Sequence, residues 1–447
     1  MIQHPRDGIK HHPNFHAALN VGRCCYGFPV TVANDIPLPL WIPRATSTTF
    51  QDNLKLPVHR WFRYSAGYSA DWARSIISEA GARRVLDPFA GSGTTLLAAQ
   101  HESAESIGLD PHPFVAKVAA TKLLWHTDVR EFEIAADRAL LRAEARSPSS
   151  STMPDLIRRI FTEGELVDLL AIRSAVEEES NPLLWLALVS VLRKCSHAGT
   201  AQWQYVLPNK SKSKVAEPYS AFRSQVALMA QDMRYMQAVV GNDGPSAIML
   251  QDDARTTTDL EPGWADLVLT SPPYANNFDY ADATRVEMSF LGEIDSWADL
   301  KPLRALLIRS SSQAMSRYSA EYVLEEAPEV ESIRKELKRA YLELAEVRRA
   351  KAGGKAYHTM AVAYFHDLAL SWTTIRRATR SGGRACFVVG DSAPYGVHLP
   401  VERWLGELAV GAGFESWTFD KVRTRNDKWK NRKHTVPLQE GHLWVEG

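Results

Sequence analysis

The amino-acid sequence predicts an α/β protein with a doubly wound, mostly parallel sheet and helical insertions. A short apolar run, RRVLD, leads into a Gly-rich turn and a helical segment, and a second apolar run, SIGLD, follows. Two more strand-like runs, AIMLQDDA at 247–254 and ADLVLT at 265–270, come after a long helical stretch. Strands that alternate with helices in this way form parallel sheets covered by helices on both faces.

Length and composition are typical of a soluble, globular protein with more than one domain. The chain has 447 residues, of which 45% are hydrophobic and 23% charged. Lys+Arg and Asp+Glu both total 52, so the net charge is zero. This balance argues against a protein that is basic throughout, but a local basic face is enough to bind nucleic acid.

The cysteines and the apolar runs indicate a cytoplasmic location. Four cysteines, two of them adjacent at Cys24 and Cys25, form neither a disulfide framework nor a regular metal-ligand pattern. We therefore expect a reduced chain without a metal site. The longest apolar run, 183–192, is too short to span a bilayer, and the N-terminus lacks the apolar core of a signal peptide. We expect no membrane association.

The helical and strand-like patterns divide the chain into segments. Residues 1–56 are rich in Pro and turn-forming residues, which predicts an irregular arm. In the segment 329–351, apolar residues recur at helical spacing, which predicts an amphipathic helix lying on the protein rather than a coiled-coil partner. The predicted parts are the arm at 1–56, an α/β domain made of 57–125, 246–294 and 356–447, a helical insertion at 126–245, and a second helical insertion at 295–355.

The turn DPFAGSG, 87–93, has the composition of a ligand-binding loop. Gly91 and Gly93 allow the backbone to approach a ligand closely, and the following helix directs its free amides at that ligand. Asp110 ends the next strand, where an acidic residue commonly holds ribose hydroxyls. The turn is neither G-x-G-x-x-G nor a lysine-bearing phosphate loop. A dinucleotide or nucleoside triphosphate is therefore disfavoured, and Asp87 suits a ligand with an amino or sulfonium group.

DPFAGSGTT at 87–95 together with TSPPY at 270–274 resembles the DNA amino-methyltransferases that use S-adenosylmethionine. The resemblance covers roughly 57–125, 246–294 and 356–447, and it implies a Rossmann-like class I methyltransferase sheet. It implies that Asp87, Gly91 and Gly93 line the methionine end of the cofactor. Asp110 then binds the ribose, and Asp253 meets the adenine amino group. The remaining implied cofactor residues are Phe89 and Tyr64.

The corner Ser271-Pro272-Pro273-Tyr274 suits methyl transfer to an exocyclic amine. The lone pair of such an amine is delocalised into the base, so the catalyst must accept hydrogen bonds from the NH₂ group. Ser271 Oγ and the Pro272 carbonyl can accept them, and the two prolines keep that carbonyl out of sheet pairing. Tyr274 offers a ring on which a flipped base can stack. No covalent nucleophile is required.

Ser271 favours cytosine as the target, because in the family serine at this position accompanies N4-cytosine methylation more often than N6-adenine methylation. The Gly-rich turn precedes the Ser-Pro-Pro-Tyr corner here, whereas many relatives with serine have the reverse order. Methylation of adenine N6 and of a structured RNA therefore stay as alternatives. A third hypothesis is a non-catalytic subunit that binds the cofactor. The intact Gly-rich turn and the intact Ser-Pro-Pro-Tyr corner argue against it.

A basic run at 421–433 is the first candidate for contact with DNA phosphates. Such a run is often only a solvated loop, but here it follows a strand of the α/β domain. NKSKSK at 209–214 is a second, weaker candidate, and base recognition is expected in one of the two insertions. The predicted partners are double-stranded DNA and a restriction or defence protein. The candidate DNA-binding residues are Arg423, Arg425, Lys428, Lys430, Arg432 and Lys433.

Overall fold

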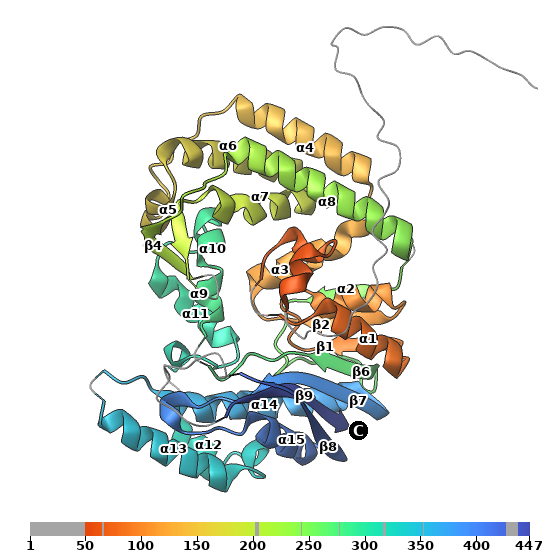
Figure 1. The fold of residues 1–447 in the computed structure, drawn as a ribbon, viewed down its shortest axis with the longest axis vertical. Coiled ribbons are helices and arrows are strands. Elements are labelled where there is room, and N and C mark those ends of the chain that lie inside the picture. The colour runs from red at the N-terminus through yellow and green to blue at the C-terminus, as the bar shows by residue number, and fades with distance from the viewer. Residues whose placement is uncertain are drawn as a thin grey trace, which may run out of the picture. The chain divides into compact units, whose positions relative to one another are not determined.

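A seven-stranded sheet forms the centre of the α/β domain (Figure 1). Its strand order is β5-β2-β1-β6-β7-β9-β8, with β5, β2, β1, β6 and β7 parallel and β9 antiparallel to both of its neighbours. The predicted doubly wound α/β fold is therefore confirmed. The strands are β1 (Arg84–Asp87), β2 (Glu105–Leu109), β5 (Ala247–Leu250), β6 (Ala265–Thr270), β7 (Thr379–Gly390), β8 (Ser416–Thr424) and β9 (Gln439–Glu446).

This computed structural model describes the chain from residue 50 onward, with short gaps. The described ranges are 50–64, 67–201, 205–242, 244–276, 278–315, 319–351, 353–425 and 437–447. The predicted arm thus lies outside the described residues except for its last part, which includes the 3₁₀ helix Phe50–Lys55. All seven sheet strands fall inside the three segments predicted for the α/β domain.

The helices next to β1 and β2 begin and end where local sequence directs them. Helix α1 (Ala70–Ala80) starts at Ser69, whose side chain accepts from Trp72 N, and ends at Gly81 with a left-handed φ of 57°. Both boundaries follow from the sequence. Helix α2 (Thr94–His101) starts directly after Gly93, and α3 (Pro113–Lys122) has proline in its first turn.

The first insertion is a helical layer that shares its core with the α/β domain. Tightly packed apolar side chains of this layer continue without a break to Phe114 of α3 and to Trp61, upstream of the sheet. The insertion is therefore not a separately packed module. Its elements are α4 (Val129–Glu144), α5 (Asp155–Ile160), α6 (Glu163–Glu179), α7 (Pro182–Cys195), the hairpin β3 (Ala198–Thr200) and β4 (Val206–Ser211), and α8 (Pro218–Val240).

One buried carboxylate, Asp232 on α8, fixes the chain just upstream of α1. It accepts from Val58 N at 3.0 Å, from Trp61 Nε1 at 3.0 Å, and from Arg60 through both Nε and Nη2. Val58 has φ 63°, a backbone conformation that a β-branched residue rarely adopts. The four hydrogen bonds to Asp232 offset the strain of this turn.

The second insertion packs on the helices that cover β7. Helix α13 (Arg334–Arg349) buries Leu337, Ala340 and Leu344 against α14 (Tyr357–Ala378), and its charged face points outward. The predicted amphipathic helix is confirmed. The remaining helices are α9 (Tyr280–Ala283), α10 (Arg285–Leu291), α11 (Leu300–Leu306), α12 (Ala320–Glu325) and α15 (Val401–Gly411). Among the helices described, none is long and apolar enough to cross a membrane.

We predict that Asp232→Ala lowers the free energy of unfolding by about 3 kcal/mol, because it removes one partner of a buried ion pair and leaves two buried N–H donors unpaired. Urea denaturation measures this loss. The matched control is Glu144→Ala, since Glu144 pairs with Arg223 where both side chains are about half exposed. It should cost less than about 1 kcal/mol. Equal losses in the two variants would contradict the role given to Asp232.

Candidate active site

The predicted site residues gather at one edge of the sheet. The parallel strands β1, β2, β5 and β6 end there at Asp87, Leu109, Leu250 and Thr270. The strand order reverses between β1 and β6, the place where doubly wound sheets bind ligands outside their carboxyl ends. The Gly-rich turn and the Ser-Pro-Pro-Tyr corner leave the sheet from these two neighbouring strands.

The Asp87 side chain connects the Gly-rich turn to the end of β6, where the Ser-Pro-Pro-Tyr corner begins. Its carboxylate accepts from Phe89 N at 3.1 Å, from Thr95 Oγ1 at the start of α2, and from Thr270 Oγ1 at the end of β6. Thr95 Oγ1 also lies 3.2 Å from the Leu269 carbonyl. Asp87 is fully buried, and burial raises its pKa to about 6, partly offset by these hydrogen bonds. The carboxylate thus holds both motifs in register.

The Gly-rich turn is bound to the end of β2. Gly91 N donates to Asp110 Oδ2 at 3.1 Å, and His112 N donates to Asp110 Oδ1 at 2.8 Å. Gly91 and Gly93 both have positive φ, 51° and 84°. A Cβ on Gly93 would lie only 3.3 Å from Ala119 Cβ of α3. Burial raises the pKa of Asp110 to about 7.

A buried lysine holds the turn from behind. Lys122 Nζ donates to the Ser92 carbonyl at 3.2 Å and to the His59 carbonyl at 3.3 Å. It therefore ties the Gly-rich turn to the segment that Asp232 fixes. Burial lowers the pKa of Lys122 to about 7.

Phe89 and Tyr64 are the two aromatic residues predicted to contact the cofactor. Phe89 packs edge-on against Phe387 of β7, with ring centroids 6.4 Å apart. Tyr64 is half-buried, and its pKa is raised well above the ordinary value by burial and then by the nearby Asp110 carboxylate. A role for Tyr64 in the cofactor site stays a prediction.

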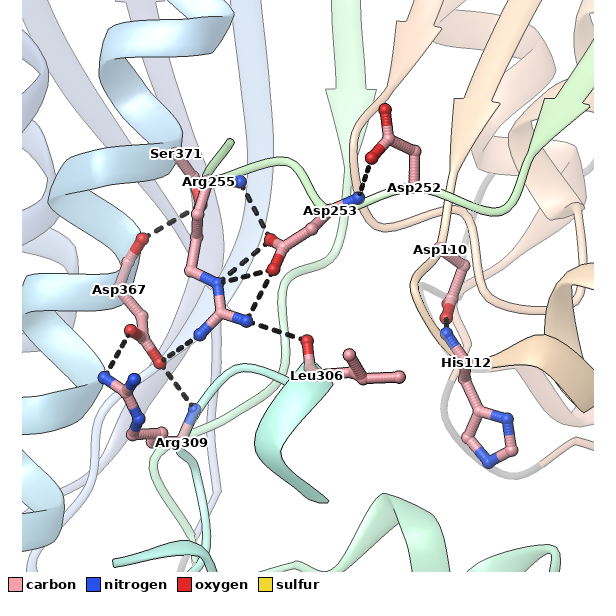
Figure 2. A network of polar contacts seen from close by, with 9 residues as sticks. All are labelled: Asp110, His112, Asp252, Asp253, Arg255, Leu306, Arg309, Asp367 and Ser371. Atoms are coloured by element: carbon pink, nitrogen blue, oxygen red, sulfur yellow. Dashed lines mark hydrogen bonds and ion pairs between the residues drawn. The ribbon is translucent and has the colours of Figure 1, made fainter. Parts of the chain in front are cut away.

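Asp253, predicted to face a ligand, is held by an arginine in the loop after β5 (Figure 2). Its carboxylate accepts from Arg255 through N, Nε and Nη2 at 2.6–3.0 Å. Arg255 also pairs with Asp367 of α14 at 3.1 Å and donates to the Leu306 carbonyl at 2.8 Å. Asp367 is buried and pairs with Arg309 as well. Asp253 thus belongs to a charge network that joins the loop to α14 and to the second insertion.

The side chain of the neighbouring Asp252 points in a different direction from that of Asp253. In Figure 2 the Asp253 side chain runs toward Arg255, whereas the Asp252 side chain points away from it. Asp252 Oδ1 accepts from Asp253 N at 2.7 Å. The backbone of this loop is adjacent to the Asp110 segment, because Asp110 N donates to the Leu250 carbonyl at 3.2 Å.

The corner Ser271-Pro272-Pro273-Tyr274 follows β6 directly. Ser271 Oγ donates to the Val388 carbonyl of β7 at 3.3 Å, and Tyr274 N donates to the Tyr280 hydroxyl at 3.3 Å. Pro272 is buried, while Ser271, Pro273 and Tyr274 are partly exposed. The corner is thus anchored by β7 and α9 and still presents polar atoms and a ring to solvent.

The predicted DNA-binding residues are only partly described. Arg423 and Arg425 both pair with the carboxylate of Glu440, at 2.5 and 3.3 Å. The Arg425 guanidinium also lies over the Tyr274 ring, 5.1 Å from its centroid. Lys428, Lys430, Arg432 and Lys433 lie outside the described residues.

Several residues of this site escaped prediction from sequence. Thr95 and Thr270 are ordinary residues in the motifs, and only their shared contact with Asp87 marks them. Lys122, Arg255 and Asp232 contact the loops around the site from helices or loops with no motif of their own. Within the described ranges no group of His, Cys, Asp or Glu side chains is arranged to hold a metal ion.

Comparison with known proteins gives one family match. Residues 43–121 match the model of a DNA methylase family, a stretch that contains β1, the Gly-rich turn and Asp110. The Type II methyltransferase M.BsoBI of Geobacillus stearothermophilus is 22% identical over 418 residues, covering 82% of this chain and 80% of that protein. The Type II methyltransferase M.AvaI of Nostoc sp. is 23% identical over 401 residues, covering 82% and 81%.

These similarities agree with the sheet topology. The family match covers the Gly-rich turn and Asp110, and both relatives match 82% of the chain. The strand order, with one antiparallel strand inserted next to β7, is that of a Rossmann-like methyltransferase sheet. The chain is thus similar to DNA methylases at 43–121 and to Type II methyltransferases over most of its length.

Proposed function

We propose that this protein transfers a methyl group from S-adenosylmethionine to the exocyclic N4 amine of a flipped cytosine in DNA. The observation that carries the proposal is the placement of the two motifs. The Gly-rich turn and the Ser-Pro-Pro-Tyr corner end adjacent strands, β1 and β6, and Asp87 binds both. Both relatives are named Type II methyltransferases, which supports a role beside a restriction or defence partner.

The residues around the turn fit S-adenosylmethionine. Gly91 and Gly93 adopt positive φ, and a side chain at Gly93 would meet Ala119, so the turn is shaped for close approach of a ligand. Asp110 would accept from the ribose hydroxyls, and Phe89 and Tyr64 would flank the cofactor beside it. When bound, S-adenosylmethionine supplies an electrophilic methyl group on a sulfonium.

Asp252 is the better candidate for the adenine amino group than Asp253. The Asp253 carboxylate already accepts four hydrogen bonds from three nitrogen atoms of Arg255, and accepting another from a ligand would compete with these. Asp252 uses Oδ1 for Asp253 N and points away from the arginine (Figure 2). Arg255 would thus act by holding the loop, while Asp252 contacts the cofactor.

We predict that Asp252→Ala weakens binding of S-adenosylmethionine by about 1–3 kcal/mol, the range for a lost hydrogen bond to a charged group. Asp253→Ala should mainly lower the melting temperature, because Arg255 loses a partner in a largely buried pair. Calorimetric titration and thermal unfolding separate the two effects. The exposed Asp259 is the matched control, and Asp259→Ala should change neither. If only Asp253→Ala lost affinity for S-adenosylmethionine, Asp253 and not Asp252 would be the residue that contacts the adenine.

The Ser271 hydroxyl is arranged to accept a hydrogen bond from the target amine. Its proton is donated to the Val388 carbonyl, and its oxygen, which also lies beside the Tyr274 hydroxyl, would use a lone pair to accept from the base. The Pro272 carbonyl would be the second acceptor. Together they would draw the amine lone pair toward the methyl group, and the Tyr274 ring would hold the flipped base in place. Burial raises the pKa of the Tyr274 hydroxyl, so the ring stays neutral.

The choice of cytosine rests on serine at position 271, and N6 of adenine is the alternative. We predict N4-methylcytosine in DNA from cells that express the protein, measured by mass spectrometry of digested DNA. N6-methyladenine as the sole modified base would overturn the choice of base and leave the mechanism intact. Neither base modified, with S-adenosylmethionine bound, would favour a structured RNA as substrate. In the active protein, Ser271→Ala should lower kcat by about 10²–10³, while Tyr274→Phe should be mild because the ring is kept.

The basic run after β8 is the proposed contact with DNA phosphates. We predict that replacing Lys428, Lys430, Arg432 and Lys433 with alanine weakens DNA binding at all sequences and flattens its dependence on salt concentration. Binding of S-adenosylmethionine should be unchanged. Fluorescence anisotropy with labelled duplex DNA at several salt concentrations measures the slope. An unchanged slope would show that the run is only a solvated loop.

A further inference from the structure

We propose that Arg425 is a positioning residue that holds the Tyr274 ring for the incoming base, rather than a contact with DNA phosphate. The proposal rests on the function proposed above for Tyr274. Arg425 directly follows β8, at the start of the basic run, and sequence alone groups it with the phosphate-binding residues. Its contacts assign it to the Ser-Pro-Pro-Tyr corner instead.

The guanidinium of Arg425 is held on three sides. Its carbon lies 5.1 Å from the centroid of the Tyr274 ring, within the range of a cation–π contact. Nη1 donates to the Asp391 carbonyl at 3.1 Å, and Nε pairs with Glu440 Oε2 at 3.3 Å. The Arg425 side chain is only 22% exposed and Glu440 only 8%. A guanidinium committed in this way is not available to neutralise a phosphate without breaking these contacts.

The strand beside the corner leaves room for this contact. Gly390 ends β7, and a Cβ there would lie 3.0 Å from Arg425 Nη1, 3.2 Å from its Cδ and 3.4 Å from Tyr274 Cε2. Glycine at this position therefore allows the arginine and the tyrosine to pack together against β7. The φ of Gly390 is not in the left-handed region, so an alanine there would disturb the packing and not the backbone.

The arrangement has a direct consequence for catalysis. Because the guanidinium covers one face of the Tyr274 ring, a flipped base would stack on the other face. The ring plane is then set before the base arrives, which reduces the loss of side-chain freedom on binding. The planar, forked guanidinium contacts the ring, a carbonyl and a carboxylate in one fixed geometry, which the compact ammonium of lysine does not reproduce.

Aromatic ¹H–¹³C NMR of ring-labelled tyrosine tests the contact without any DNA. The Tyr274 signal is identified by its loss in Tyr274→Phe. Arg425→Lys and Gly390→Ala should both shift that signal. The matched control is Arg384→Lys, because Arg384 lies 4.7 Å over the Trp444 ring and pairs with Glu446, a similar contact elsewhere on the sheet. That variant should leave the Tyr274 signal in place. An unmoved signal in Arg425→Lys overturns the proposal.

Methyl transfer to unmethylated bacteriophage DNA tests the consequence. Arg425→Lys should lower kcat about tenfold, the effect of losing a moderate cation–π contact, with KM for S-adenosylmethionine unchanged. Arg425→Ala should leave the salt slope of DNA binding unchanged. A phosphate contact predicts the opposite: a nearly normal kcat in Arg425→Lys and, in Arg425→Ala, a slope reduced by about 0.9. The phosphate-contact result overturns the proposal. A higher kcat in Arg425→Lys also overturns it, because it would mean that the base stacks on the ring face that the guanidinium covers.

The two tests separate this inference from the proposed function. If the unaltered protein methylates no DNA, the proposed function fails, and the NMR shifts alone decide whether Arg425 holds Tyr274. If the unaltered protein is active and the NMR signal does not move in Arg425→Lys, the proposed function stands and the role given to Arg425 fails.

Discussion

The buried carboxylate of Asp87 is the interaction on which the rest of the site depends. It binds the first residues of the Gly-rich turn, the first turn of α2 and the end of β6. A buried carboxylate is costly unless it is hydrogen-bonded, and these partners come from three separate elements. Satisfying the charge therefore requires that the Gly-rich turn and the Ser-Pro-Pro-Tyr corner be in register. The hydrogen bonds that the buried Asp87 carboxylate requires thus set the distance between the proposed cofactor site and the proposed catalytic corner.

The helical insertion contributes to the same site from the other side. Asp232 on α8 holds the strained turn at Val58, and Lys122 joins the next residues to the Gly-rich turn. Both side chains are buried, so neither contact can be lost cheaply. The hydrophobic core that the insertion shares with α3 also fixes the insertion to the α/β domain. An insertion that reads bases would thus be rigidly connected to the residues that hold the cofactor.

Sequence predicted the parts of the fold that local patterns determine. The strands, the Gly-rich turn, the cap at Ser69 and the amphipathic helix α13 all follow from composition and spacing within a few residues. The partners of charged residues are different, because they come from distant elements. Arg255 is only two residues from Asp253, but its other partners, Asp367 and the Leu306 carbonyl, come from distant parts of the chain. The strand order itself required long-range pairing of β7 with β9.

Arg423 and Arg425 show why charge alone does not indicate a role. They are two residues apart in the same basic run, and both pair with Glu440. The Arg423 side chain is 46% exposed, whereas that of Arg425 is 22% exposed and faces the corner. An exposed arginine can exchange its carboxylate for a phosphate at little cost, since surface ion pairs contribute little. A partly buried arginine that also contacts a ring and a carbonyl cannot. Burial therefore distinguishes Arg425 from Arg423, and the burial of a side chain cannot be read from the pattern of charges in the sequence.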